Sequence, residues 1–454
     1  MKLKLPGELL QLSRTLQRHG FQCYLVGGAV RDMLLKKTAK DFDVATNALP
    51  DQVMKFFRRV IPTGIQHGTV TVLMGPMQFE VTTFRVEGDY SDHRHPDSVT
   101  FTRTIDADLE RRDFTINAIA YDMEEKRFYD PFRGGEDLKQ KVIRAIGDPG
   151  ARFQEDGLRM LRAARIAAQL SFCVDQQTVA AMAAHAALID QISAERIRDE
   201  FVKTLESPRP SVGLELLRET GLLIRILPEL SAGIGVVQPS LHCFDVYTHS
   251  LAACDAAPRG NLHVRLAALF HDVGKPVTRG EGPHHEPTFY GHEKEGARLT
   301  AEILTRLRFP HRLIQSVTHL VAQHMFNYDQ SWTDAAVRRF IRRVGLDALD
   351  DLFSLRRADQ AGMCGRPVPL PLLTDFRERI KKIVAESQVF SARDLAVDGN
   401  DLIRELGIPP GREIGLLLEF LLEGVLDDPE MNSPDRLLEA AKRFLRERLH
   451  PAAD

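Results

Sequence analysis

The sequence predicts an α/β head followed by an all-α region, because two different hydrophobic periodicities occupy the two parts of the chain. Within the first 150 residues, β-branched and aromatic runs predict strands at 22–26, 69–74 and 78–84, with a helical stretch at 51–59. From about Phe153 onward, apolar residues recur at helical spacing in segments such as LRMLRAARIAAQL and GLELLRETGLLIRIL. We therefore expect one mixed domain and then helices.

Clusters of proline and glycine divide the predicted helices into domains. Such clusters occur at 207–210, 231–240, 279–287 and 365–371. We predict four domains: the head at 1–150, a helical neck and body at 151–235, a third helical domain at 236–365 and a helical tail at 366–454.

The composition is that of a folded globular protein. The net charge is -3, so binding to nucleic acid would require a local basic surface. No apolar run approaches the roughly 20 residues that span a bilayer, and the amphipathic N-terminus is unlike a signal peptide. We expect a cytoplasmic protein with no membrane partner. The five cysteines form no CxxC pair, which argues against a disulfide framework or a zinc finger.

A glycine turn follows the first predicted strand. Strand-like CYLV leads into Gly27 and Gly28, and the apolar MLL after them predicts a helix. Backbone N–H groups at a helix N-terminus bind anions, and Arg31 can add a charge-assisted contact. Gly28 and Arg31 are therefore candidate phosphate ligands, although most Gly-Gly pairs are only turns.

Two aspartates follow this turn in the same predicted unit. On an extended segment Asp41 and Asp43 point to the same side, so both can hold one cluster of Mg²⁺ ions. Two such ions can activate an attacking hydroxyl and stabilise a leaving pyrophosphate. Glu80 is a candidate third carboxylate, and a solvated turn is the alternative for the aspartate pair.

Five motifs occur in a fixed order over about residues 20–230. They are GGAVRDMLLKKTAKDFDVAT, RRDFTINA from Arg111, DPF at 130–132 through Ile143 and Arg144, EDGLRMLRA from Glu155, and ERIRDEF from Glu195. Together they resemble the class II tRNA nucleotidyltransferases, the family of the CCA-adding enzymes, whose relatives are bacterial poly(A) polymerases. Gly157 departs from the family, which usually carries proline at that position.

The resemblance implies a β-polymerase-like head in which Asp41 and Asp43 are the catalytic Mg²⁺ ligands. It also implies a set of nucleotide-binding residues, namely Gly28, Arg31, Arg112, Asp113, Asp156, Arg159, Arg162 and Arg165. Among them Arg112 and Asp113 would hold the triphosphate and the ribose. An ion-pair network is the alternative for Arg111 and Arg162.

Asp156 and Arg159 are neighbours on one helix face, and their chemistry can distinguish bases. Cytosine and adenine each present an amino group beside a ring nitrogen acceptor, which a carboxylate and a guanidinium match. Guanine and uracil present the opposite pattern, so each mismatch would leave a buried polar group unpaired at about 1–3 kcal/mol. These two side chains can therefore replace a template.

A polar, turn-rich segment lies between Glu87 and Thr104. It is an ordinary surface loop in the simplest interpretation. In the family, a corresponding loop accompanies enzymes that add the terminal A, and enzymes adding only CC lack it. The resemblance therefore argues against a CC-only enzyme.

Histidines and aspartates recur across the predicted third domain. Their order, H…HD…H…H…D, resembles the HD metal-dependent phosphohydrolases over about residues 241–365, with Lys275 following in HDVGK. The ligands that this resemblance implies are His249, His271, Asp272, His292, His324 and Asp359, with His319 as a rival to His324. Such a site would suit Mn²⁺, Ni²⁺, Co²⁺ or Zn²⁺.

We expect an enzyme that adds CCA to the 3′ end of tRNA from CTP and ATP, with Mg²⁺ as its cofactor. The near alternative is a relative that adds only A or makes poly(A), and the distant one is an HD phosphohydrolase with a nucleotide-sensing head. Arg196, Arg198 and Lys203 are candidates for contact with the tRNA backbone. The tail helices could pack internally, bind tRNA or dimerise, and the oligomeric state is left open.

Overall fold

The computed structural model describes residues 3–39, 41–88, 99–238, 243–364, 371–386 and 389–449. They pack into two compact units. Unit 1 comprises Met1–Val236 and Glu302–Pro310, and unit 2 comprises Val237–Ala301 and His311–Asp454. The three predicted boundaries between the four domains remain predictions, and the one at 365–366 lies outside the described residues.

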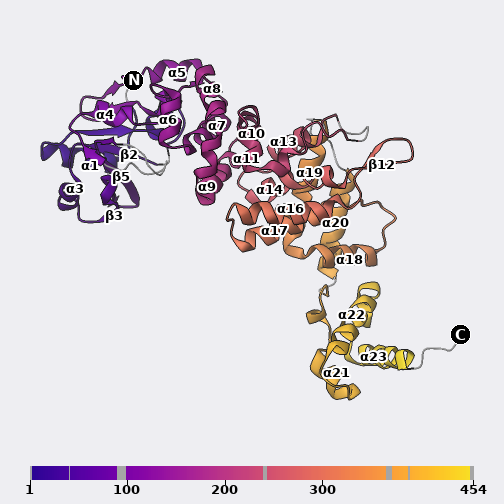
Figure 1. The fold of residues 1–454 in the computed structure, drawn as a ribbon. Helices are drawn as coiled ribbons and strands as arrows, with labels where there is room; N and C mark the ends of the chain where they lie inside the picture. The colour runs from indigo at the N-terminus through magenta and orange to yellow at the C-terminus, as the bar shows by residue number, and fades with distance from the viewer. Residues whose placement is uncertain are drawn as a thin grey trace. The chain divides into compact units, whose positions relative to one another are not determined.

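Unit 1 contains a seven-stranded mixed sheet in the order β3-β4-β5-β2-β1-β8-β9. Figure 1 labels three of its strands, β2, β3 and β5. Its strands are β1 Cys23–Val26, β2 Asp43–Thr46, β3 Val60–Gly64, β4 Thr69–Met74, β5 Met77–Thr83, β8 Ala120–Asp122 and β9 Arg127–Tyr129. Only the β2–β5 pair is parallel among these described strands, with Asp43 opposite Glu80. The three predicted strands are confirmed as β1, β4 and β5, with ends shifted by a residue at most.

Helices flank this sheet and continue beyond it. Those of unit 1 are α1 Gly7–Arg18, α2 Gly28–Leu34, α3 Pro50–Phe56, α4 Ile105–Glu110, α5 Gly134–Gln140, α6 Pro149–Glu155, α7 Leu158–Leu170, α8 Gln176–Ala184, α9 Ala194–Leu205, α10 Pro210–Glu219, α11 Leu223–Ile226 and α12 Pro228–Ser231. One core cluster joins Val26 of β1 and Ala45 of β2 to Leu109 of α4. This packing fixes α4 beside the strand ends that carry the candidate site.

The helical part of unit 1 centres on α7. Asp148 caps α6 by accepting a hydrogen bond from the Ala151 backbone N–H, and two residues separate the end of α6 from the start of α7. Gly213 of α10 allows close packing on α7, because a Cβ there would lie 2.8 Å from the backbone oxygen of Ala164. Helix α7 is therefore held firmly where it carries Arg159, Arg162 and Arg165.

Three short strand pairs complete the sheet inventory of the described residues. They are β6 Arg85–Glu87 with β7 Val99–Phe101, β10 Val142–Ile143 with β11 Cys173–Val174, and β12 Gly280–Glu281 with β13 Pro287–Thr288. The predicted polar loop leaves β6 and returns at β7, and its residues 89–98 lie outside the described residues.

Unit 2 is helical, as the sequence predicts. Its helices are α13 Val246–Ala256, α14 Leu262–Phe270, α15 Lys275–Thr278, α16 His292–Arg306, α17 His311–Gln323, α18 Asp334–Val344, α19 Leu349–Cys364, α20 Pro371–Glu386, α21 Gly399–Leu406, α22 Arg412–Asp427 and α23 Pro434–Leu449. The last residues of α16 belong to unit 1. Helices α13 and α19 pack closely, since a Cβ on Gly362 would lie 2.8 Å from the Ala253 backbone nitrogen.

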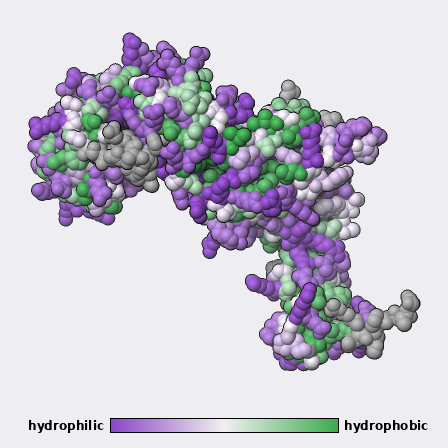
Figure 2. Space-filling view, in the orientation of Figure 1, coloured by the Kyte–Doolittle hydropathy of each residue, from purple (hydrophilic) through white to green (hydrophobic). Residues whose placement is uncertain are grey.

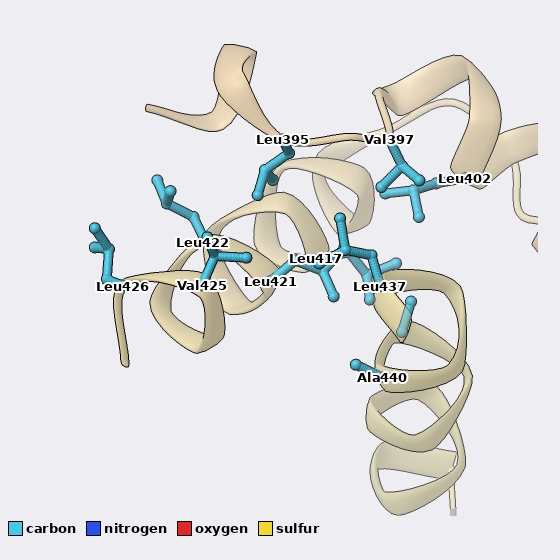
Figure 3. Packing of buried hydrophobic residues seen from close by; sticks show 11 residues of the cluster. Leu395, Val397, Leu402, Leu417, Leu421, Leu422, Val425, Leu426, Leu437 and Ala440 are labelled. Atoms are coloured by element: carbon cyan, nitrogen blue, oxygen red, sulfur yellow. The ribbon is translucent and has the colours of Figure 1, made fainter. Parts of the chain in front are cut away.

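The predicted tail helices pack internally. Figure 3 shows Leu417 and Leu421 of α22 near Leu437 of α23, within one buried cluster that also includes Leu395 and Leu402. Helix α22 is also joined to α18, where Arg339 donates to Glu423 at 2.9 Å. Internal packing is thus confirmed for these side chains, while contact with tRNA and dimerisation stay predictions.

Hydrophilic residues cover much of the face shown in Figure 2. Among the described residues, no helix combines the length and the apolar character needed to cross a membrane. The cytoplasmic location expected from the sequence stays a prediction.

Candidate functional site

The glycine turn lies at the end of β1, directly beside the aspartates. Gly27 has φ 73° and ψ -144°, a conformation that L side chains rarely adopt, and α2 begins at Gly28. A Cβ on Gly27 would lie 3.1 Å from Asp43 Oδ2 and 3.2 Å from Arg112 Nη1. The absence of a side chain therefore lets a carboxylate and a guanidinium approach the turn together.

Asp41 and Asp43 line the same cavity, and Asp43 begins β2 between Val26 of β1 and Glu80 of β5. Burial raises the pKa of Asp43 above its usual value, the guanidinium of Arg112 opposes that rise, and the carboxylate of Asp41 adds to it. Burial, Asp43 and Asp41 likewise raise the pKa of Glu80. Crowded carboxylates of this kind suit a divalent cation, which would relieve their repulsion.

The cavity has a volume of about 910 Å³ and a mostly charged lining. All ten residues predicted for catalysis and nucleotide binding in the head and neck line it, namely Gly28, Arg31, Asp41, Asp43, Arg112, Asp113, Asp156, Arg159, Arg162 and Arg165. Lys37, His67, Arg85 and Arg111 line it as well. The volume and the density of cations suit a nucleoside triphosphate.

The cavity arginines are paired with acceptors of the protein. Arg31 donates to Asn117 at 2.9 Å and to Asp32 at 2.8 Å. Arg162 donates to Asp113 at 2.8 Å, and Arg165 lies 2.6 Å from Glu200. Although burial would raise the pKa of Asp113, Arg162 and hydrogen bonds from Asn117 and the Phe114 backbone lower it to about 2.

Asp156 and Arg159 also have protein partners. Asp156 accepts hydrogen bonds from Arg196 Nη2 at 2.8 Å and from the Leu158 backbone N–H at 3.0 Å. Arg159 is 8% exposed and donates to Glu155 and, at 3.2 Å, to the backbone oxygen of Arg111. Both side chains are therefore fixed in orientation at the edge of the cavity.

Some predicted tRNA contacts have partners within the protein. Arg196 pairs with Asp156, Arg198 donates to Asp199 at 2.8 Å, and Lys203 lies 3.5 Å from Glu200. The Arg196 side chain is thus turned toward Asp156 of the cavity rather than projecting from the helix face. Contact of Arg198 and Lys203 with tRNA stays a prediction.

Sequence reasoning missed two buried carboxylates behind the cavity, Asp108 and Glu200. Asp108 precedes Arg111 and Arg112 by three and four residues, a spacing that could have indicated the pairing. Glu200 lies 35 positions after Arg165, and only the packing of α9 on α7 brings them together.

The six histidines and aspartates predicted as ligands in unit 2 converge on one buried cluster. His249 lies in α13, His271 and Asp272 follow α14, His292 begins α16, His324 follows α17 and Asp359 lies in α19. The ligand atoms of five of them form two groups, His249–His271–Asp272 and Asp272–His292–His324.

Asp272 belongs to both groups through different oxygens. Its Oδ2 lies 3.2 Å from His271 Nε2 and 3.5 Å from His249 Nε2, and its Oδ1 lies 3.4 Å from His292 Nε2 and 3.8 Å from His324 Nε2. Asp359 Oδ1 lies 3.1 Å from His249 Nε2. The donor set therefore suits two neighbouring cations bridged by one carboxylate.

Backbone carbonyls orient three of the imidazoles. The Nδ1 atoms of His271, His292 and His324 lie 2.9, 2.8 and 2.7 Å from the backbone oxygens of Ala268, Phe289 and Val321. Donation from Nδ1 directs the Nε2 atom into the cluster, where it can bind a metal once it carries no proton. His319 instead places Nε2 2.7 Å from the Val344 backbone oxygen, so His324 is the histidine that joins the cluster.

The pKa values of two of these histidines move in opposite directions. Burial and the neighbouring His271 lower the pKa of His324 to about 3. Burial would also lower the pKa of His271, but the carboxylates of Asp272 and Asp359 raise it to about 10. A cation entering the cluster would therefore displace the His271 proton.

A glycine turn, two crowded aspartates and an arginine-lined cavity on a mixed sheet define a nucleotidyltransferase. Family models agree along the chain. Residues 23–144 match the poly A polymerase head domain, residues 171–234 the probable RNA and SrmB-binding site of polymerase A, and residues 295–441 a putative tRNA nucleotidyltransferase domain 2.

Relatives match over nearly the whole length. The chain is 35% identical to a CCA-adding enzyme of Geobacillus sp. (strain WCH70), over 95% of each chain, and 34% identical to one of Lactobacillus helveticus (strain DPC 4571), over 96% of this chain and 97% of the relative. The structure of the Bacillus stearothermophilus CCA-adding enzyme in complex with CTP is similar at a TM-score of 0.75 and 30% identity, covering 98% of each chain. The chain therefore belongs to the family of the CCA-adding enzymes.

Proposed function

We propose that the cavity of unit 1 binds CTP and ATP in turn and transfers their nucleotides to the 3′ end of tRNA, so that CCA is added without a template. The observation that carries this proposal is the convergence of all ten predicted residues on one cavity. The CTP bound to the similar Bacillus stearothermophilus enzyme supports it.

Asp41 and Asp43 would hold divalent metal, commonly Mg²⁺ in this family, which when bound promotes attack by a hydroxyl and stabilises a leaving pyrophosphate. The 3′-oxygen of the RNA forms a bond to the α-phosphorus as the bond from that phosphorus to the bridging oxygen breaks. The hydroxyl proton leaves to solvent and pyrophosphate departs. Asp41 and Asp43 fit this role because they are crowded oxygen donors on the cavity wall.

The arginines would bind the triphosphate. Arg31 and Arg112 lie on the side of the glycine turn, where the first N–H groups of α2 also point. Arg162 and Arg165 reach the cavity from α7. Asp113, kept ionised by Arg162, would accept a hydrogen bond from the ribose.

Asp156 and Arg159 would select the base. Asp156 accepts from the amino group of cytosine or adenine while Arg159 donates to the adjacent ring nitrogen. Arg196 and Glu155 hold the two side chains, so a guanine or uracil cannot be accommodated by simple rotation of either one.

Three tRNA transcripts test this function: one without CCA, one without the final A, and one complete. We expect the first to gain CCA, the second A and the third nothing, with CTP and ATP in Mg²⁺. Extension of only the second would identify an A-adding enzyme, and long A tails would identify a poly(A) polymerase.

We further propose that unit 2 holds an HD-type metal centre that hydrolyses a phosphate ester at an RNA end, for instance a 2′,3′-cyclic phosphate. The specific observation is the buried cluster of four imidazoles and two carboxylates, three of the imidazoles oriented by backbone carbonyls. Bound Mn²⁺, Ni²⁺, Co²⁺ or Zn²⁺ would supply Lewis acidity for attack by water on phosphorus.

Metal analysis of the purified protein tests this second proposal, together with hydrolysis of cyclic and monoester RNA ends. We expect bound transition metal and hydrolysis of at least one ester class. A protein that retains no such metal and hydrolyses none of them in Mn²⁺ or Ni²⁺ would contradict it.

A further inference from the structure

A fully buried carboxylate stands behind the cavity. Asp108 of α4 is 0% exposed and does not line the cavity. Its Oδ1 accepts from Arg111 Nε at 3.0 Å and Nη2 at 2.8 Å, and its Oδ2 accepts from Arg112 Nη2 at 3.2 Å. Each oxygen thus holds a different arginine of the cavity wall.

Arg112 lies on the side of the cavity proposed to bind the triphosphate. Arg112 Nη1 lies where a Cβ on Gly27 would be 3.2 Å away, beside Asp43. The same Cβ position lies 3.1 Å from Asp43 Oδ2, so the guanidinium and that carboxylate both approach the glycine turn. The Nη2 atom of Arg112 is therefore held by Asp108, while the Nη1 atom of the same guanidinium faces the glycine turn.

Arg111 contacts Arg159, which lies on the side of the cavity proposed to bind the base. The backbone oxygen of Arg111 accepts a hydrogen bond from Arg159 Nη2 at 3.2 Å. Asp108 holds the side chain of Arg111, and the same residue supplies the carbonyl that orients Arg159. One carboxylate is thus connected to both halves of the nucleotide site.

We propose that Asp108 is a positioning residue that sets the placement of Arg112 toward the triphosphate and of Arg159 toward the base. This inference rests on the proposed function of the cavity.

The physical reason is that a buried carboxylate with two arginine partners fixes both guanidinium groups through short charge-assisted hydrogen bonds. Burial would raise the pKa of Asp108, but Arg112 and Arg111 lower it, so the group is ionised. An amide at this position keeps the shape but loses the charge and one of the two acceptor oxygens. Arg112 would then lose its fixed orientation, since a flexible guanidinium next to a polar cavity has many alternative rotamers.

The test compares Asp108→Asn with Asp137→Asn. Asp137 is also a buried carboxylate of unit 1, accepting from Thr115 at 2.7 Å and lying 3.3 Å from Arg144, but it does not line the cavity. Inhibition of nucleotide addition by inorganic tripolyphosphate measures the triphosphate side, and the preference for CTP over UTP measures the base side.

We expect Asp108→Asn to raise the inhibition constant of tripolyphosphate about tenfold and to lower the preference for CTP over UTP at least threefold. Asp137→Asn should change neither by more than twofold. In an Arg112→Ala background, Asp108→Asn should raise the inhibition constant less than twofold further, because the residue through which it acts is gone.

Equal effects of the two aspartate substitutions, or full additivity of Asp108→Asn with Arg112→Ala, would overturn the inference. Should Asp108→Asn not fold, Asp108→Glu retains the charge but displaces both arginines, and a folded Asp108→Glu with wild-type inhibition and selectivity would also overturn it. If neither Asp108 variant folds, Asp108 serves the fold alone and the inference is wrong. If Arg112→Ala itself leaves the inhibition constant unchanged, the proposed function of the cavity fails instead.

Discussion

The two candidate metal sites of this protein differ in exposure and in the chemistry of their ligands. In unit 1, Asp41 and Asp43 line a cavity of about 910 Å³, with arginines around them. In unit 2, the six candidate ligands are between 0% and 7% exposed, and four of them are histidines. Carboxylates in an open cavity can share a cation with phosphate oxygens, whereas imidazoles in a closed shell retain it.

The two sites also differ in the groups that orient their side chains. In unit 1, the residues behind the site are carboxylates that orient arginines, as Asp108 and Glu200 do. In unit 2, backbone carbonyls orient imidazoles. The first arrangement orients cations that would suit an anionic ligand, and the second orients ring nitrogen atoms that would suit a metal.

The largest expected effect is on the carboxylate cluster. Asp43→Ala should reduce nucleotide addition by about a thousandfold or more, because it removes a metal ligand and a source of transition-state stabilisation. Incorporation of labelled CTP into a tRNA transcript measures this loss. Retention of transition metal by unit 2 is the internal control and should be unchanged; a loss of both would contradict the independence of the two clusters.

A substitution in the histidine cluster should reduce metal retention and leave CCA addition unchanged, which is the reverse of the result expected for Asp43→Ala. His271→Ala should lower the retained transition metal by about a hundredfold, since loss of a ligand exceeds the usual effect of losing an outer contact. Metal analysis after dialysis measures it, with His319→Ala as the matched control, because His319 is a helical histidine outside the cluster. CCA addition should stay within twofold in both variants, and equal metal loss in the two would contradict the assignment.

A smaller effect is expected on base selection. Asp156→Ala or Arg159→Ala should reduce the preference for CTP and ATP over UTP and GTP by about fiftyfold, since each variant removes one of the two mismatched contacts, of about 1–3 kcal/mol, that oppose the wrong bases. The pair Glu215–Arg218 of α10 has the same three-residue spacing and is a matched control. Full selectivity in both single variants would show that these side chains do not act as the template.

The smallest effect concerns acid stability. The pKa of Asp113 is about 2 in the folded protein against an ordinary value of 3.8, so its stabilising contribution is present above about pH 4 and is lost as the pH falls through 2. Between pH 5 and pH 2, the difference in the free energy of unfolding between the wild type and Asp113→Asn should shrink by about 2 kcal/mol for unit 1.

The fluorescence of the single tryptophan provides a control for this measurement, because it reports on unit 2. Trp332 lies in unit 2, packed against Phe376 and Phe340. When unfolding is followed by Trp332 fluorescence, the difference in the free energy of unfolding between wild type and Asp113→Asn should not depend on pH. When the unfolding of unit 1 is followed by circular dichroism, the same difference should depend on pH. A pH-dependent difference in the Trp332 signal would contradict the separation of the units.

Much of the site could be predicted from sequence because its parts are local. The glycine turn, Asp41 and Asp43 follow one another over 17 positions and end in adjacent strands. The pairing of Asp156 with Arg196 could not be predicted, because it joins residues 40 apart through the packing of α9 on α7. A carboxylate and an arginine on separate helices carry no spacing that indicates contact.

Unit 2 shows the same limit. The order of histidines and aspartates predicts the cluster, but His319 and His324 are both plausible in a helical sequence. The structure separates them because α17 ends at Gln323, and the turn after it directs His324 inward. Where a helix ends is decided by tertiary packing, which a single sequence does not display.

The pairing of the cavity arginines bears on how readily the site can be emptied between rounds. Three successive additions require pyrophosphate to depart after each one. Arg31 has Asp32 beside it, Arg162 has Asp113 and Arg165 has Glu200, so each guanidinium, if it binds phosphate as proposed, would regain a carboxylate partner when the phosphate leaves. When pyrophosphate departs, a carboxylate would replace the phosphate as the partner of each guanidinium, so no partly buried arginine would be left without a counter-charge. This arrangement favours rapid release of pyrophosphate over its tight retention.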